Sequence, residues 1–218
     1  TTANNNTGVG KSSLSATTTG GENTAVGTNA LKVNTTASNN TAVGTNALTA
    51  NTTGAQNTAV GTSAGAAITT AVNTVVMGYQ AGDAITTGNN NVAIGTTALS
   101  ANTTGTQNTA LGHASMLATT TAANNVAIGM QALTANTTGA SNVAMGTYAM
   151  LANTTASNNV AVGQGTLGAN TTGASNTAVG AFALDANTDG TNNVAVGHSS
   201  LGANIGGSSN TAVGFEAL

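Results

Sequence analysis

The chain has 218 residues, of which 3% are charged and 2% aromatic, and its formal net charge is −3. Average soluble proteins carry roughly 25% charged residues. Because Lys11 and Lys32 are the two basic residues other than histidine, the sequence excludes a basic surface for nucleic acid or anionic membranes. No apolar run approaches the roughly 20 residues of a membrane-spanning helix, and the absence of cysteine excludes disulfides and thiolate metal sites.

A repeat of 17 residues runs through the sequence. A glycine preceded by Val, Ile, Leu or Met recurs thirteen times at this interval, from Gly10 to Gly214, and we call it the repeat glycine. The consensus is N-[TV]-A-[VILM]-G-x-x-A-L-x-A-N-T-T-G-A-x. Helical repeats need roughly 33 to 47 residues, whereas short alternating stretches between N-T-T-G turns are typical of strands and tight corners. The sequence therefore predicts one all-β array over residues 1–218, a parallel β-solenoid (β-roll) of about thirteen coils.

The strand is expected just before each repeat glycine. The residue before the glycine and the Thr or Val two positions earlier share one face, with Ala between them in eleven of thirteen copies. We expect this larger face to lie inside the coil, together with the Leu found four residues after the glycine in nine copies. Replacement of Val162 by Asp is then expected to unfold neighbouring coils, because burial of an unpaired charge is costly.

Corners are expected where glycine and asparagine recur. A second glycine position alternates with Ala, and we expect a positive φ there. Two asparagine positions are expected to stack at about 4.7–4.9 Å per coil, with amides that donate and accept along each column. The second glycine position comprises Gly20, Gly54, Gly88, Gly105, Gly139, Gly173, Gly190 and Gly207. One asparagine column extends from Asn6 to Asn210, and the other includes Asn34, Asn51, Asn102, Asn136, Asn153, Asn170, Asn187 and Asn204.

Neither strand face is strongly polar, which favours association of several chains. The face made of Ala and Gly would permit close approach of a neighbouring chain, and a parallel homotrimer with its axis along the coil stack is the expected assembly. A rod of roughly 60 Å follows from thirteen coils at about 4.8 Å each. The alternative is a monomeric solenoid whose outer face of Ala and Thr contacts no other chain.

The strings Asn91-Val92-Ala93-Ile94-Gly95 and N-T-A-V-G resemble the β-roll repeats in the heads of trimeric autotransporter adhesins, which are usually shorter. The 17-residue form, with Gly78-Tyr79-Gln80-Ala81 and its N-T-T-G corners, resembles repeat arrays of bacteriophage tail-fibre proteins. The resemblance covers essentially the whole chain and implies a trimeric stalk or head on a virion or a bacterial surface. Because the chain stops in mid-repeat at Phe215–Leu218, we expect it to belong to a longer array.

No constellation of residues predicts catalysis. His113 and His198 are five coils apart, about 24 Å at the spacing of stacked strands, which is too far to share a metal. Asp185 and Asp189 are the only close carboxylates; a glycosidase-like pair is conceivable, but two solvated corner residues explain them more simply. Phosphate-loop, nucleophile-elbow and calcium-nonapeptide motifs are missing. We therefore expect no enzyme, no metal and no cofactor.

The variable residues concentrate in the two positions after the repeat glycine, which is typical of an outward rim. The six candidate surface-contact residues lie there: Tyr79, His113, Tyr148, Phe182, His198 and Phe215. They could contact a host-surface glycan or another receptor. Alternatively, they have no binding role and lie on a surface where many residue types are accepted. The N-T-T sequons could also accept glycans in a secreted protein, although the corner explains the same residues.

These features favour a non-catalytic, extracellular shaft or head segment of an adhesive fibre, either a phage tail fibre or a bacterial surface adhesin. The alternative is an ice-binding β-solenoid, because such proteins combine regular threonine rows with low charge. Val92, Val126, Val143, Val160 and Val194 interrupt the threonine row of the strands, which argues against this alternative.

Overall fold

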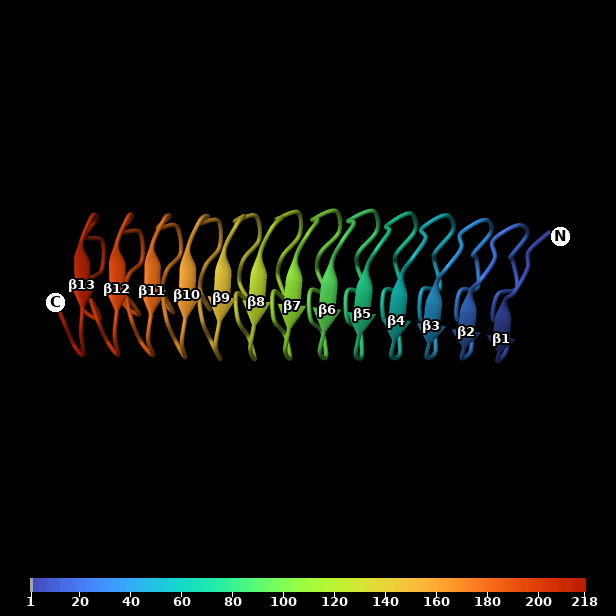
Figure 1. Ribbon diagram of the computed structural model, residues 1–218, viewed down its shortest axis with the longest axis horizontal. Coiled ribbons are helices and arrows are strands. Elements are labelled where there is room, and N and C mark those ends of the chain that lie inside the picture. Colours follow the sequence, from blue (N-terminus) through green and yellow to red (C-terminus); the bar gives the residue numbers. More distant parts are fainter. Residues whose placement is uncertain (1) are drawn as a thin grey trace. The chain divides into compact units, whose positions relative to one another are not determined.

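The computed structural model describes residues 2–218, which form about 12 turns of parallel β-solenoid with a 17-residue spacing (Figure 1). The described residues contain strands and turns and no helix, so none of them forms a helix that could cross a membrane. The chain divides into two compact units, one ending at Asn108 and the other spanning Thr109–Leu218. Each unit is described by itself.

Every strand has three residues and directly precedes a repeat glycine. The first unit contains β1 (Thr7–Val9), β2 (Thr24–Val26), β3 (Thr41–Val43), β4 (Thr58–Val60), β5 (Val75–Met77) and β6 (Val92–Ile94). The second contains β7 (Thr109–Leu111), β8 (Val126–Ile128), β9 (Val143–Met145), β10 (Val160–Val162), β11 (Thr177–Val179), β12 (Val194–Val196) and β13 (Thr211–Val213). Within each unit, consecutive strands pair in parallel and residues 17 apart face each other, as Ala25 and Ala42 do. The predicted parallel β-solenoid with one coil per 17 residues and the predicted strand positions are confirmed.

Hydrogen bonds between coils continue outside the strands. Leu31 N donates to Ala47 O (3.1 Å), and Thr35 N donates to Thr52 O (3.2 Å). The first threonine of the corner adds a side-chain bond, since Thr35 Oγ1 donates to Thr52 O (3.2 Å) and Thr52 Oγ1 donates to Thr69 O (3.1 Å). Although each coil has only three strand residues, hydrogen bonds therefore connect it to the next coil around much of its circumference.

The orientation of the strand is opposite to the sequence prediction. The middle strand residue, usually Ala, points inward and is fully buried in β2–β12, whereas the first and third residues point outward. Val162 is therefore a half-buried outward residue, and the prediction that it is buried inside the coil is wrong. The reason for expecting Val162→Asp to unfold neighbouring coils, burial of an unpaired charge, is thereby removed. The physical reason for the observed orientation is the narrow interior of a 17-residue coil, where a methyl group is what fits between the strand and the opposing leucine column.

The leucine column behaves as predicted. Leu31, Leu48, Leu99 and Leu133 are completely buried, although Leu218 in the last coil is exposed. These leucines adopt an unexpected left-handed backbone, with φ between 49° and 55° in Leu48, Leu99 and Leu133. A non-glycine residue in this region costs roughly 1–2 kcal/mol. Complete burial of the leucine side chain offsets a cost of this size.

The positive φ angles do not lie at the second glycine position, so that prediction is also wrong. Gly20, Gly54 and their equivalents have ordinary φ angles. The strictly conserved glycine of the repeat is the one with φ between 125° and 137°, and a Cβ on Gly10 would lie 2.7 Å from Gly27 O. The closeness of the next coil therefore explains why this position holds glycine in all thirteen copies.

Both asparagine columns are buried and hydrogen-bonded from coil to coil. In the first column, Asn23 Oδ1 accepts the backbone N–H of Asn40 (3.0 Å). In the second, Asn51 Nδ2 donates to Asn34 Oδ1 (3.1 Å). The two columns converge, because Gly54 O accepts Nδ2 hydrogens from both Asn40 (3.0 Å) and Asn51 (2.8 Å). The predicted stacking of the asparagines is confirmed, and it leaves few buried amides unpaired.

Two neighbouring coils of the first unit have a rearranged interior. Glycine replaces leucine at Gly65 and Gly82, and isoleucine replaces the second-column asparagine at Ile68 and Ile85; all four are buried. A Cβ on Gly65 would lie 2.8 Å from Ile68 Cδ1, so the isoleucine occupies the space of the missing leucine.

The exchange has two further consequences in the same unit. Val76 is the one large residue at a middle strand position, and its Cγ1 would lie 2.7 Å from a Cβ on Gly82. Asn51 Oδ1 is buried without a hydrogen-bond partner, because the next coil has Ile68 where an amide would donate. These coils keep the interior filled but interrupt the amide column.

Ala161 and Val162 test the orientation of the strand. Ala161→Leu should destabilise the solenoid by about 1–3 kcal/mol, because it overpacks the narrow interior. Val162→Leu should be nearly neutral, since Leu111 occupies the same outward position in β7. The measurement is the urea-unfolding midpoint of the two variants, followed by circular dichroism. A larger loss for Val162→Leu than for Ala161→Leu would contradict the observed orientation.

Gly65 and Ile68 test the exchange of volume. Gly65→Leu should clash with Ile68, and Ile68→Asn should leave a void beside Gly65, so each single change should destabilise the first unit. The double variant restores the consensus pair and supplies a donor for Asn51 Oδ1. In a double-mutant cycle, the double variant should lose less unfolding free energy than the two single variants lose together, by about 0.5–3 kcal/mol. Strict additivity would show that the two positions do not share space.

Candidate interaction surfaces

The outward residues of the strands form a surface that we call the outer strand face, defined as the first and third residues of each strand. Thr or Val occupies the first position and Val, Ile, Leu or Met the third. The third residue is substantially exposed, with 36% of Val43 and 42% of Leu111 open to solvent. Each unit therefore presents two parallel rows of β-branched and other apolar side chains.

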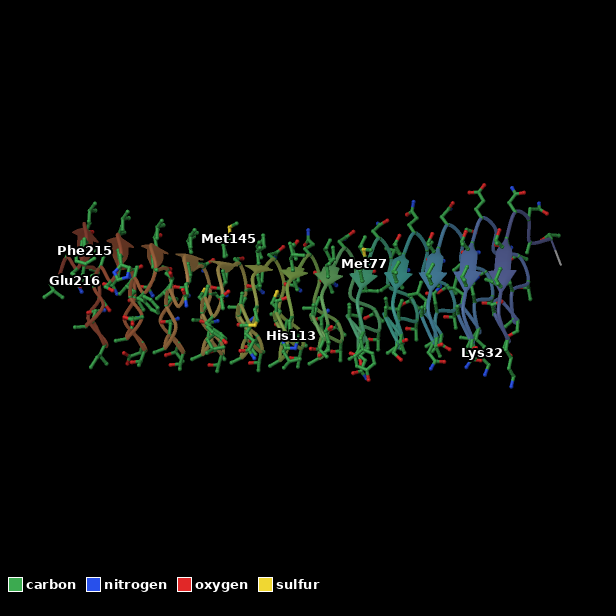
Figure 2. All side chains as sticks on the ribbon, turned by 90° about the horizontal axis from the view of Figure 1, so that it is seen from below. Lys32, Met77, His113, Met145, Phe215 and Glu216 are labelled. Atoms are coloured by element: carbon green, nitrogen blue, oxygen red, sulfur yellow. The ribbon has the colours of Figure 1, made fainter. Side chains whose placement is uncertain are left out.

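Charged residues avoid this face. The strands carry none of the seven acidic and basic residues, which lie in the turns instead. Figure 2 shows Met77 at the strand row of the first unit and Lys32 on the opposite side; Met145 and His113 have the same relation in the second unit. The outer strand face thus combines a row of Thr or Val with a row of partly exposed apolar residues and carries no charge. Exposed apolar side chains grouped in this way are typical of a surface that meets another molecule.

Three of the six predicted contact residues come together in the second unit. The ring centroids of Phe182 and His198 lie 5.9 Å apart in an edge-to-face arrangement, and those of His198 and Phe215 lie 5.4 Å apart in a stack. A Cβ on Gly165 would lie 2.9 Å from the Phe182 ring, so this glycine makes room for the phenylalanine. The rings pack against one another along consecutive coils, which limits the ring faces that remain open to a ligand.

The other three predicted contact residues remain separate. Tyr79 is 54% exposed in the first unit, and Tyr148 is 37% exposed in the second, where His113 is also exposed. In the part of the chain that the structure describes, none of the three has a ring contact. Their exposure agrees with an outward rim, but the structure does not gather all six residues into one site.

The carboxylates form no catalytic arrangement within the described residues. Asp185 Oδ1 would lie 3.4 Å from a Cβ on Gly202, and Asp189 Oδ1 would lie 2.8 Å from a Cβ on Gly206, so each aspartate lies against a different turn of the next coil. Partial burial raises the pKa of Asp83, which is isolated from other acids. Residues 2–218 contain no group of three or more His, Cys, Asp or Glu that could hold a metal ion.

The N-T-T sequons are poor glycan acceptors in the folded chain. Asn34, Asn102 and Asn153 are completely buried, and the Nδ2 atoms that would be glycosylated donate hydrogen bonds, from Asn153 to Asn136 Oδ1 at 2.9 Å for example. Their structural role accounts for their recurrence.

Sequence reasoning missed the outer strand face because it placed these residues inside the coil. One signal in the sequence could have corrected this: Val76, the single large residue in the middle of a strand, lies between the two copies that have Gly65 and Gly82 instead of Leu. Such compensation indicates that the middle residue and the leucine share the interior.

Comparisons with known proteins give no relative from which an activity could be transferred. A scan against protein-family models, a search of curated proteins and a search of solved structures each found no match.

Proposed function

We propose that this chain is a non-catalytic structural segment of an extracellular adhesive fibre, of the kind found in phage tail fibres or bacterial surface adhesins, and that its copies associate through the outer strand face. The observation that carries the proposal is the charge-free outer strand face, on which an apolar residue recurs at the third position of every strand. A surface of this kind gains stability when a partner covers it, because apolar area is removed from water.

The regular repeat supports a second copy of the chain as that partner. Parallel copies aligned along the coil direction place equivalent strands at the same height, so each contact recurs every 17 residues. A closed ring of identical chains satisfies every copy equally, and a trimer is the expected number. The contact surface differs from the sequence expectation, since the Ala side of the strand is inside the coil and the Thr and Val side is outside.

Ice binding is the second candidate function, and the structure supplies one observation in its favour. The strands β1–β4 place Thr7, Thr24, Thr41 and Thr58 in a row at consecutive coils, on the outward side of a sheet. Ice binding needs this face open to water, whereas the fibre needs it covered by another chain. The two functions therefore compete for one surface.

The mass in solution separates the two functions. Light scattering after size exclusion should give a mass of three chains of 20.6 kDa each. The variant Val26→Lys/Val43→Lys should be monomeric, because lysines on the outer strand face oppose its burial. The matched control Thr49→Lys adds charge at the position that Lys32 occupies one coil earlier, and it should leave the trimer intact.

A stable monomer of the unmodified chain that shows thermal hysteresis would contradict the fibre and favour ice binding. A mass unchanged by Val26→Lys/Val43→Lys would contradict the proposed contact surface.

A further inference from the structure

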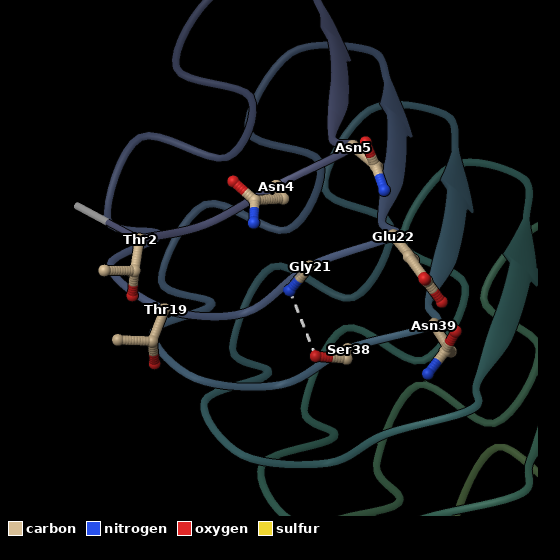
Figure 3. Close-up of a pocket in the computed structure, with 8 residues that line it drawn as sticks. All are labelled: Thr2, Asn4, Asn5, Thr19, Gly21, Glu22, Ser38 and Asn39. Carbon is tan, nitrogen blue, oxygen red and sulfur yellow. Dashed lines mark hydrogen bonds between the residues drawn. The ribbon is translucent and has the colours of Figure 1, made fainter.

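The first unit contains an open polar groove of about 390 Å³ at its first coils (Figure 3). One side is formed by the corner threonines Thr2 and Thr19, and the other by Asn5, Glu22 and Asn39. Residues at the same position of successive coils lie on the same side, so the groove follows the direction in which the coils stack. A ligand in it would contact three successive coils.

Gly21 makes the floor of the groove deeper than its equivalents. Two and three coils later, Ala55 and Val72 occupy this position and project a side chain where Gly21 has none. The floor itself is fixed by hydrogen bonds between coils: Gly21 N donates to Ser38 Oγ (3.0 Å), as Figure 3 shows, and Glu22 N donates to Asn4 O (3.0 Å). The groove is therefore preformed.

The polar side chains around the groove are available to a ligand. Among the residues that the structure describes, no side-chain hydrogen bond involves Asn4, Asn5, Glu22 or Asn39. The backbone of the floor is already paired, since Asn39 N donates to Gly21 O (3.1 Å). A peptide strand would therefore find no free ladder of backbone groups to extend.

We propose that this groove binds a neutral, extended oligosaccharide. Amide and hydroxyl groups both donate and accept hydrogen bonds, which matches the hydroxyls of a sugar chain. The described lining residues include no large apolar side chain, and Glu22 is the single charged one, so its carboxylate disfavours an anionic ligand. The inference rests on the proposed adhesive function and gives it a ligand class, with Gly21 as the residue that provides the depth.

The test uses the 218-residue chain and three neutral hexasaccharides as probes: cellohexaose, maltohexaose and chitohexaose. At least one should bind in isothermal titration, and hexagalacturonate should bind more weakly. Gly21→Val should reduce the affinity about tenfold or more, because its side chain fills the groove. The matched control Ala55→Val makes the same kind of change away from the groove and should keep the affinity.

A second variant tests the groove even if Gly21→Val does not fold. Asn39→Ser removes one amide from the rim, and serine occurs at the equivalent position in Ser141 and Ser175 with a similar backbone, so the fold tolerates it. Asn39→Ser should also weaken binding, whereas the control Asn73→Ser should not.

Three outcomes would overturn the proposal: no binding of any neutral probe, stronger binding of hexagalacturonate, or equal affinities of Gly21→Val and Ala55→Val. Light scattering tests the fibre assembly independently of sugar binding. A trimer that binds none of the neutral probes would contradict the groove proposal alone, and a monomer that binds one of them would contradict the fibre assembly alone.

Discussion

The structure depends on a corner carbonyl group that accepts hydrogen bonds from two asparagine amides in most coils, wherever both asparagine columns are filled. In the second unit, Gly173 O accepts Nδ2 hydrogens from Asn159 (3.0 Å) and Asn170 (2.9 Å), which belong to different columns and successive coils. These bonds close the corner and join it to the coil before it. Because each coil has few large apolar groups, this buried polar network supplies the specificity that a larger hydrophobic core would give a globular protein.

The small cross-section of the coil limits the size of the side chains that its interior can hold. A coil of 17 residues has room for the leucine column, two asparagine columns and methyl groups, and larger residues appear only with compensation. Ile68 fills the volume that Gly65 leaves empty, yet it cannot donate to Asn51 Oδ1. Volume and hydrogen bonding are thus separate requirements, and the rearranged coils meet the first while giving up part of the second.

A small interior leaves much of the chemistry on the surface. The strands project β-branched and other apolar side chains outward, so the surface that most needs a partner is opposite the leucine column. The turns carry the charges, the aromatic rings and the polar groove near Gly21. Under the proposed function, association of copies would use the strands, and recognition of a ligand would use the turns that lead into them.

The sequence by itself determined the coil length, the strand positions, the buried leucine column and the asparagine columns, because each follows from identical residues recurring at a fixed interval in a parallel stack. It did not determine which strand face lies inside. Alternation separates two faces, but the choice depends on the distance across the coil to Leu99 and its equivalents, which is short enough to admit Ala93 and exclude Ile94. The left-handed leucines and the contact of Phe182 with His198 were also beyond the sequence, since both depend on how the turns close in three dimensions.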